Sequence, residues 1–303
     1  MKKIIVLGST GSVGRQALQV AKGQKIVGIS GHSNLKLLEK QAKEFGCPYT
    51  LDPMELASQK CDIVVNAISG LAGLPPLLAA LEAGNKVALA NKESIVAAGS
   101  RLHKYRDQII PVDSEHSSIY RCLQGREEPI RRIILTCSGG PFFGRTDLFG
   151  ITPKQALAHP TWKMGKKISI DSATLMNKGF EIIEAHHLFD IPYEKIDVLI
   201  HPQSLVHGIV EFEDGSILAH ASNPDMRIPI AYALGLPAPN NKLNLTSLEF
   251  FQPDHKTFKG IKLALKFQSR GESLVRANDE AVSKFLAGEI SFLDIYKYIE
   301  KNA

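Results

Sequence analysis

Residues 2–14 decide the fold, and they read KKIIVLGSTGSVG. Lys2 to Gly8 is a short apolar run that ends in glycine, which is typical of a buried parallel strand. A glycine turn and a helical pattern follow, the order that a dinucleotide-binding fingerprint requires. Glycines let the backbone approach a pyrophosphate, which then lies on the helix N-terminus. The spacing is G-x-x-G-x-x-G rather than G-x-G-x-x-G, and a tight turn without a ligand is the alternative. We predict a cofactor-binding turn made of Gly8, Ser9, Thr10, Gly11, Ser12 and Val13.

The end of the second predicted strand, Lys25 to Ser30, indicates which dinucleotide binds. An NAD-binding domain usually carries Asp or Glu there, to hold the ribose hydroxyls. This chain has Gly31-His32-Ser33-Asn34 instead, so no acid would repel a 2′-phosphate. We therefore predict NADPH, with Ser33 and Asn34 as small polar donors. The alternative is a simple loop in which Asn34 caps a helix over residues 35–45.

The stretch Pro111 to His116 (PVDSEH) follows the apolar pair Ile109-Ile110 and carries two carboxylates. If it stays extended, side chains two positions apart share a face, so Asp113 and Glu115 would converge. Convergent carboxylates repel each other unless a positive charge lies between them, usually a hard divalent cation. The sequence therefore predicts a metal site here.

Two more apolar strands are predicted over residues 62–68 and 86–90. The first is followed by the turn Ser69 to Gly73, which we expect near the nicotinamide half of the cofactor. The second is followed by Asn91-Lys92-Glu93. Open α/β sheets bind ligands at the carboxyl ends of their strands, so we predict Lys92 at the ligand. An ordinary surface lysine is the alternative.

The second half of the chain predicts a domain that mixes antiparallel strands with helices. Strands are expected over residues 131–137 and 198–201, and a hairpin with a D-G turn over residues 207–221. The polar stretch 152–165 is bounded by proline and glycine and holds the only tryptophan, Trp162, which suits a mobile lid. A buried tryptophan in a static loop is the alternative.

A helix is predicted from about residue 173 to 188. Its apolar stripe repeats at i, i+4 and i+7: Met176, Phe180 and Ile183. Ser172 suits the N-cap, and with Asn177 and Lys178 in the first turns it would make a phosphate seat. Glu181 would then be a third carboxylate for the metal. The alternative for this group is a solvated helix face.

Composition limits the class of protein. The net charge of +5 is scattered along the chain, without the basic block of a nucleic-acid arm. The four cysteines form no C-x-x-C pair, which favours free thiols in a reducing cytosol. The chain starts directly in a strand, and no apolar run approaches the roughly 18 residues of a membrane helix. We expect a cytoplasmic protein that binds neither nucleic acid nor membrane.

Eight motifs occur together in one order: GSTGSVG at 8–14, ANKES at 90–94, PVDSEHS at 111–117, SGGPF at 138–142, HPxWxMG at 159–165, DSATxMNK at 171–178, IHPQS at 200–204 and PDMR at 224–227. On these motifs the chain resembles the 1-deoxy-D-xylulose 5-phosphate reductoisomerase family over nearly its whole length. The resemblance implies an α/β fold with an N-terminal Rossmann-like NADP-binding domain, a central α+β catalytic domain and a short C-terminal helical segment. It also implies a homodimer.

The resemblance implies an activity and a set of site residues. The family converts 1-deoxyxylulose 5-phosphate to 2-C-methylerythritol 4-phosphate with NADPH and Mg²⁺ or Mn²⁺, with Co²⁺ as a further candidate. The implied metal ligands are Asp113, Glu115 and Glu181. The implied phosphate ligands are Ser138, Ser172, Asn177 and Lys178. Ser114, Glu115 and Lys92 would contact the rest of the substrate, with His159, His201 and Trp162 around it. Asn91, Lys92, Glu93, Gly165 and Met226 would lie at the cofactor. Lys92, Glu115, His159 and His201 would be catalytic.

The domain boundaries follow from the same comparison. We expect a cofactor domain over residues 1–113, a catalytic domain over 114–234, a linker over 235–255 and a helical segment over 256–303. The stretch between Phe45 and Cys61 is short for the family, and the chain ends at Ala303, soon after Phe292. The family's NAANE segment appears as RANDE at 276–280. The chain thus reads as a compact member with a shortened C-terminus.

Two other functions fit parts of the sequence. Another NADP-dependent dehydrogenase of a small anionic substrate would share the first domain but would not need three carboxylates at a metal. A cofactor-binding regulator would need no turnover at all. Metal dependence separates the first from the family's reaction, and any turnover excludes the second.

Overall fold

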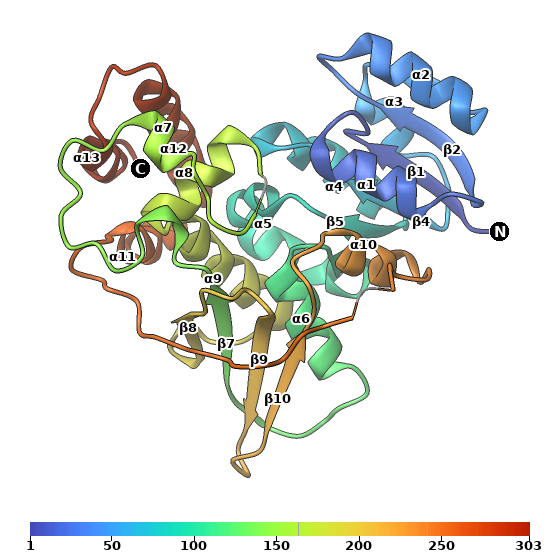
Figure 1. Cartoon of the computed structure of the whole chain (residues 1–303). Coiled ribbons are helices and arrows are strands. Elements are labelled where there is room, and N and C mark those ends of the chain that lie inside the picture. The colour runs from blue at the N-terminus through green and yellow to red at the C-terminus, as the bar shows by residue number, and fades with distance from the viewer. Residues whose placement is uncertain (163, 241) are drawn as a thin grey trace. The chain divides into compact units, whose positions relative to one another are not determined.

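The computed structural model describes residues 1–162, 164–240 and 242–303 (Figure 1). Lys163 of the predicted lid and Asn241 of the predicted linker lie outside these ranges. The described residues form two compact units. The first unit is residues 1–95, 101–117 and 225–240, and the second is residues 96–100, 118–162, 164–224 and 242–303.

The first unit is built on a parallel sheet with the order β3-β2-β1-β4-β5-β6 over the described residues. This is the strand order of the dinucleotide-binding fold. Its strands are β1 (Lys3–Leu7), β2 (Lys25–Ser30), β3 (Tyr49–Thr50), β4 (Ile63–Asn66), β5 (Lys86–Leu89) and β6 (Ile109–Pro111). Its helices are α1 (Ser12–Val20), α2 (Leu35–Phe45), α3 (Pro53–Ala57), α4 (Leu74–Glu82), α5 (Lys92–Ala98), α6 (Ser114–Leu123) and α10 (Arg227–Leu234), with 3₁₀ turns η1 (Gly70–Gly73) and η2 (Gly99–Gln108). The boundary between the units falls inside α5 and α6.

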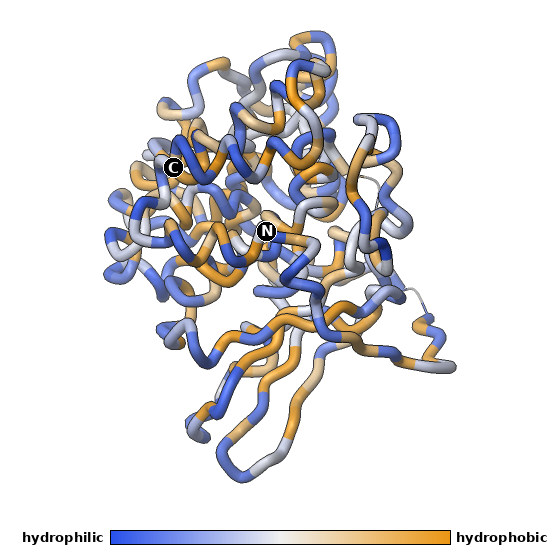
Figure 2. Tube along the Cα trace, turned by 90° about the vertical axis from the view of Figure 1, so that its left-hand side faces the viewer, coloured by the Kyte–Doolittle hydropathy of each residue, from blue (hydrophilic) through white to orange (hydrophobic). Residues whose placement is uncertain are grey.

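The second unit is built on a mixed sheet with the order β10-β9-β7-β8 over the described residues. Its strands are β7 (Ile130–Cys137), β8 (Ile196–Ile200), β9 (Val206–Phe212) and β10 (Ile217–Ala221). Its helices are α7 (Pro153–Ala156), α8 (Lys166–Thr174), α9 (Met176–Phe189), α11 (Gly260–Lys266), α12 (Gly271–Leu286) and α13 (Phe292–Asn302), with η3 (Gly140–Phe142), η4 (Tyr193–Lys195) and η5 (Gln268–Arg270). The β9–β10 hairpin forms as predicted, and its tip is hydrophilic in Figure 2.

Continuous burial explains why the strands of the first unit form. All of β1 after Lys3 and all of β4 are buried, as expected for strands covered on both faces by helices. In the core of the first unit, α10 packs against the sheet: Ile230 and Leu234 join the same buried cluster as Ile4 and Val6. The segment 225–240 therefore completes the first unit, although it follows most of the second in sequence.

Two local predictions were wrong. The acidic stretch is not extended, because α6 begins at Ser114 and Ser117 N donates to Asp113 O at 2.8 Å. The predicted helix over 173–188 is broken at Leu175, whose φ of +60° ends α8 before α9 begins. Ser172 consequently lies inside α8 rather than at an N-cap.

Across the part of the chain that the structure describes, every helix is too short or too polar to cross a membrane.

Candidate active site

The glycine turn after β1 packs so closely against the neighbouring backbone that Gly8 in the turn and Gly14 in α1 cannot carry a side chain. A Cβ at Gly14 would lie 2.2 Å from Gly8 O, and a Cβ at Gly8 would lie 2.7 Å from Ala67 O. Gly8 also has a φ of +78°, in the region that favours glycine. Gly11 is the N-cap of α1, and no described side chain caps this helix end, so its N–H groups can serve an anion. The turn therefore fits a dinucleotide pyrophosphate.

Ser9 does not point toward this ligand position. Its side chain is buried and donates from Oγ to Gln41 Oε1 at 2.8 Å, while Gln41 Nε2 donates back to Ser9 O at 3.0 Å. Ser9 thus fixes the turn to α2 through Gln41, and only its backbone is available to bind the cofactor. Sequence reasoning missed Gln41, which is one polar residue among several on α2.

Ser33 and Asn34 follow β2 and are both exposed. Asn34 caps α2, with its side-chain oxygen accepting from Leu37 N at 3.1 Å. The helix-cap alternative is therefore correct for Asn34. Because capping uses only the oxygen, the amide of Asn34 and the hydroxyl of Ser33 can still serve as donors at this strand end.

The turn after β4 is held by Asn91. Its amide donates to the carbonyls of Ile68 and, at 2.8 Å, of Gly70, and its oxygen accepts from Ser94 N at 2.7 Å. Asn91 is buried, so it orders the turn that we expect at the nicotinamide. Glu93 is half-buried in the first turn of α5, and Met226 packs partly buried against the core of the first unit.

The acidic pair after β6 lies beside a lysine at the start of α5, which follows the neighbouring strand β5. Lys92 Nζ is 2.5 Å from Asp113 Oδ2, and Lys92 is 9% exposed. Glu115 accepts from Ser114 Oγ at 2.6 Å, and carboxylate oxygens of Asp113 and Glu115 come within 4.8 Å of each other. The two carboxylates thus converge from a helix start rather than from a strand. Oxygen ligands of this kind are what Mg²⁺ and Mn²⁺ take, so the pair fits a hard divalent cation.

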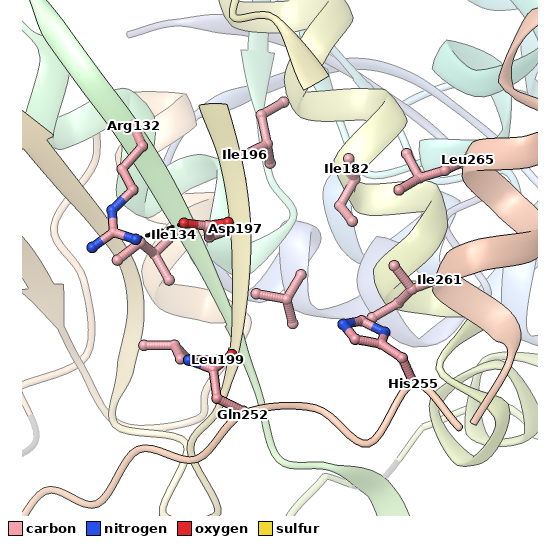
Figure 3. A pocket seen from close by; sticks show the side chains of 11 residues that line it. Arg132, Ile134, Ile182, Ile196, Asp197, Leu199, Gln252, His255, Ile261 and Leu265 are labelled. Atoms are coloured by element: carbon pink, nitrogen blue, oxygen red, sulfur yellow. Dashed lines mark hydrogen bonds and ion pairs between the residues drawn. The ribbon is translucent and has the colours of Figure 1, made fainter. Parts of the chain in front are cut away.

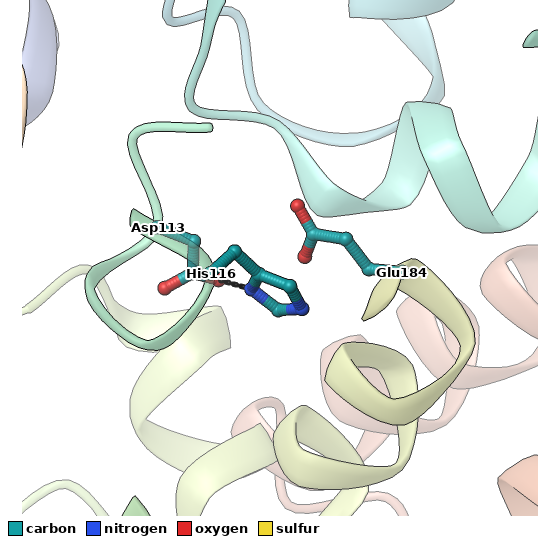
Figure 4. A group of neighbouring side chains, drawn as sticks. All are labelled: Asp113, His116 and Glu184. Carbon is teal, nitrogen blue, oxygen red and sulfur yellow. Dashed lines mark ion pairs between the residues drawn. The ribbon is translucent and has the colours of Figure 1, made fainter. Parts of the chain in front are cut away.

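His116 belongs to the same group and was not singled out from the sequence. It is fully buried, and Figure 4 shows its ring turned toward Asp113, with 4.0 Å between His116 Nδ1 and Asp113 Oδ2. Its place in the PVDSEHS motif was the available signal. At 4.0 Å the two atoms are too far apart for a direct hydrogen bond, so His116 is a buried neighbour of the Asp113 carboxylate.

In the second unit, the loop after β7 brings Ser138 to His159. The Ser138 Oγ to His159 Nε2 distance is 3.0 Å, and Gly140 N donates to Ser138 Oγ at 3.1 Å. The N–H groups of Thr161 and Trp162 donate to His159 Nδ1, at 3.2 and 2.9 Å. Nδ1 is thus an acceptor, which leaves Nε2 as the donor to Ser138. Burial lowers the pKa of His159 and favours this neutral form.

The first turns of α9 hold a buried cation and anion. Lys178 and Glu181 are each 1% exposed and form an ion pair, and Lys178 Nζ also donates to Thr136 O at 2.5 Å. Asn177 Nδ2 donates to Glu181 Oε1 at 2.5 Å. Ser172 lies half-buried on α8, across the α8–α9 break. The solvated-face alternative is wrong for Lys178 and Glu181, since neither meets solvent.

Three further predicted residues have defined surroundings in the second unit. His201 is fully buried, with its Nδ1 2.8 Å from Glu249 O and its ring stacked on Phe250 at 4.6 Å. Trp162 is half-buried and lies near His207, with 6.1 Å between the ring centroids. Gly165 is exposed at the N-cap of α8.

A cavity of about 450 Å³ lies elsewhere in the second unit, against β8, α9 and α11 (Figure 3). Its lining is largely aliphatic, with Arg132 paired to Asp197 at one side. None of the predicted site residues lines it, so this cavity is separate from the proposed active site.

Comparison with known proteins agrees with this reading. Residues 4–53 and 52–99 match the family model described as 1-deoxy-D-xylulose 5-phosphate reductoisomerase, residues 109–189 its C-terminal domain, and residues 221–303 the DXP reductoisomerase C-terminal domain. The reductoisomerase of Thermodesulfovibrio yellowstonii is 44% identical over 348 aligned positions, covering 99% of this chain and 91% of that protein. That of Thermoanaerobacter sp. is 45% identical over 350 positions, covering 100% and 92%.

Solved structures give the same answer. A DOX-P reductoisomerase in complex with NADPH, fosmidomycin and magnesium superposes with a TM-score of 0.92 at 36% identity, covering 99% of this chain and 88% of the other. The Zymomonas mobilis enzyme in complex with NADPH gives 0.90 at 38% identity, covering 99% and 90%.

The strand order and the glycine turn define a dinucleotide-binding α/β protein with a second, mixed-sheet unit. The family-model match and the sequence identities of 44% and 45% show the family: the chain belongs to the 1-deoxy-D-xylulose 5-phosphate reductoisomerase family. The predicted fold class, with its Rossmann-like sheet, mixed second sheet and C-terminal helices, is confirmed. The aligned positions outnumber the 303 residues of the chain, so the alignment places gaps in it, as expected for a compact member.

Proposed function

We propose that the chain converts 1-deoxy-D-xylulose 5-phosphate to 2-C-methyl-D-erythritol 4-phosphate with NADPH and Mg²⁺ or Mn²⁺. One observation carries the proposal. In the first unit, the glycine turn after β1, the Asn91-Lys92 pair after β5 and the acidic pair after β6 all follow the carboxyl ends of one parallel sheet. A cofactor seat and a carboxylate pair are therefore built on the same edge, in a family whose solved members bind NADPH and magnesium.

We assign the metal to Asp113, Glu115 and Glu181. When bound, a divalent cation polarises the carbonyl and hydroxyl oxygens of a substrate. Lys92, held at Asp113, adds positive charge where oxyanions develop. Ser114 and Glu115 hold the substrate's oxygens.

We assign the substrate phosphate to Ser138, Ser172, Asn177 and Lys178. A buried ammonium and neighbouring hydroxyls and amide match a dianion. Anchoring the phosphate away from the reacting carbons orients them. His159 ties the segment around Trp162 to Ser138, so that segment can cover the substrate and exclude water. His201 lines the same pocket.

We assign NADPH to the glycine turn, to Ser33 and Asn34 at the 2′-phosphate, and to residues around the nicotinamide: Asn91, Lys92, Glu93, Gly165 and Met226. When bound, NADPH supplies the hydride that reduces the rearranged aldehyde. We propose boundaries at residues 113, 234 and 255 as a functional division into cofactor, catalytic, linker and helical regions, although α10 packs in the core of the first unit.

The test is NADPH oxidation with 1-deoxyxylulose 5-phosphate after treatment with EDTA, then with added Mg²⁺ or Mn²⁺. We expect turnover only when substrate and metal are both present. Turnover of equal rate in EDTA would contradict the metal assignment. A folded, NADPH-binding protein that leaves this substrate untouched under all metals would contradict the reaction.

We also propose a homodimer in the cytoplasm. Large apolar side chains are exposed along one segment of the second unit: Leu245, Leu248, Phe250 and Phe251, with Phe143 packed against Phe251 at 5.3 Å. Exposed apolar side chains gathered in this way mark surfaces that bind other proteins. Light scattering during gel filtration should give twice the chain mass of 33.2 kDa. A mass of one chain would contradict the dimer.

A further inference from the structure

The corner between α8 and α9, residues 171–178, carries most of the proposed phosphate ligands and has a strained backbone. Leu175 at its centre has a φ of +60° and is 4% exposed. This left-handed conformation is unfavourable for a residue with a Cβ, and it persists only where the surroundings determine it. The contacts that hold Leu175 in this conformation therefore also fix the backbone that carries the phosphate ligands.

The C-terminal helices of the same unit supply these contacts. Tyr296 on α13 donates from its hydroxyl to Thr174 O at 3.2 Å. Asn278 on α12, fully buried, donates from Nδ2 to Asp171 Oδ1 at 2.8 Å. Gly260 at the start of α11 lies so close that a Cβ there would be 2.3 Å from Thr174 O. Figure 1 shows these helices beside α8 and α9.

The same helices also reach the other phosphate loop. Phe292, the first residue of α13, packs edge-on against Phe142, with 5.4 Å between ring centroids and 79° between planes. Phe142 ends η3, which begins two residues after Ser138. One rigid aromatic contact thus links α13 to the loop that carries Ser138, and Tyr296 links it to the α8–α9 corner.

We propose that α11, α12 and α13 set the geometry of the phosphate seat, with Tyr296 and Asn278 as positioning residues that do not touch the substrate. The inference rests on the proposed function, because it takes Ser172, Asn177 and Lys178 as phosphate ligands. Misplacing such donors by a fraction of an ångström weakens binding of the phosphate. NADPH is assigned to other residues, so its binding should not change.

The first test compares two tyrosines on α13. Tyr296→Phe removes the hydroxyl that holds Thr174, and Tyr298→Phe removes a hydroxyl that donates to exposed Glu280 at 2.7 Å. In Tyr296→Phe we expect the KM for 1-deoxyxylulose 5-phosphate and the inhibition constant of inorganic phosphate to rise about threefold to tenfold, the worth of one hydrogen bond. The dissociation constant of NADPH should stay the same. Tyr298→Phe should behave as the wild type.

The split between KM and kcat separates positioning from stability. A variant that merely unfolds in part loses active enzyme, which lowers the apparent kcat and leaves KM unchanged. That pattern, or an unchanged KM in both Tyr296→Phe and a second variant, Asn278→Ala, would overturn the inference. Asn278→Ala should raise KM at least as much as Tyr296→Phe, because it leaves the buried Asp171 carboxylate without its amide donor.

Phosphate binding is also read without turnover, by ³¹P line broadening of inorganic phosphate. If the wild-type chain binds phosphate but does not turn over the substrate, the proposed reaction fails, while weaker phosphate binding in the two variants still supports the inference. If the wild-type chain binds no phosphate, the phosphate seat and its positioning by the C-terminal helices are both refuted.

Discussion

Replacing Lys178 with Met tests the buried ion pair at the proposed active site. Lys178 and Glu181 are each 1% exposed, and Met nearly fills the volume of the lysine stem. Removing one partner of a buried pair leaves an uncompensated charge and costs about 3–5 kcal/mol. Asn177 still donates to Glu181, so we take the lower end, about 3 kcal/mol. At roughly 2–4 °C per kcal/mol, the unfolding midpoint should fall by about 6–12 °C.

The assay is thermal unfolding followed by circular dichroism, first in EDTA and then with Mg²⁺. The matched control is Lys266→Met, since Lys266 pairs with Glu300 at 2.7 Å but both side chains are more than half exposed. Such a surface pair is worth at most about 1 kcal/mol. If Glu181 binds the metal, Mg²⁺ should stabilise Lys178→Met more than the wild type, because the cation replaces the missing charge. A midpoint in EDTA equal to that of Lys266→Met would refute the reasoning from burial.

Three further outcomes are expected. Glu115→Gln should abolish turnover and leave NADPH binding intact, as measured by steady-state kinetics and NADPH fluorescence; near-normal turnover would remove Glu115 from the metal. Ser33→Asp combined with Asn34→Ala should shift preference from NADPH toward NADH, because a carboxylate repels the 2′-phosphate. Loss of the Asn34 cap should also cost about 1 kcal/mol of stability, so Asn34→Ala alone is the control. If the ratio of kcat/KM for NADPH to kcat/KM for NADH is unchanged in the double variant, the 2′-phosphate binds elsewhere. Burial and the neighbouring Arg121 lower the pKa of His220 to about 4, so this histidine is neutral in the fold and its stabilising effect is lost as pH falls from about 6.5 toward 4. His220→Gln should flatten the fall in denaturant midpoint over that window, and an equally steep fall would show that other groups carry it.

The elements that sequence predicts best are those with a local cause. The apolar runs predict β1 and β2 almost to the residue, and the glycine turn predicts that a helix follows it, because burial on both faces and the missing Cβ atoms act within a few positions. Asn34 and the D-G hairpin are equally local. The acidic pair was predicted to converge and does so, yet through a helix start that the alternation argument did not anticipate.

What the sequence could not show depends on distant contacts. The break at Leu175 is set by Gly260 and Tyr296, which lie 85 and more positions away along the chain and carry no local signal of that role. The burial of Lys178 has the same origin, since Thr136 O comes from a strand 42 positions earlier. A lysine on a helix looks solvated until the strand beside it is known.

The return of α10 to the first unit has a consequence for biosynthesis. Lys2 donates from Nζ to Leu234 O at 2.6 Å, across 232 positions of sequence, and the same helix supplies Ile230 and Leu234 to the core around Ile4. Nascent domains usually fold in order as they leave the ribosome. Here the strands made first keep an apolar face uncovered until all four described strands of the second unit's sheet have been synthesised, because β10 ends at Ala221 and α10 begins at Arg227. Ribosome-bound chains stopped before residue 225 should therefore be protease-sensitive in their N-terminal part, and they are the nascent chains that most need a chaperone.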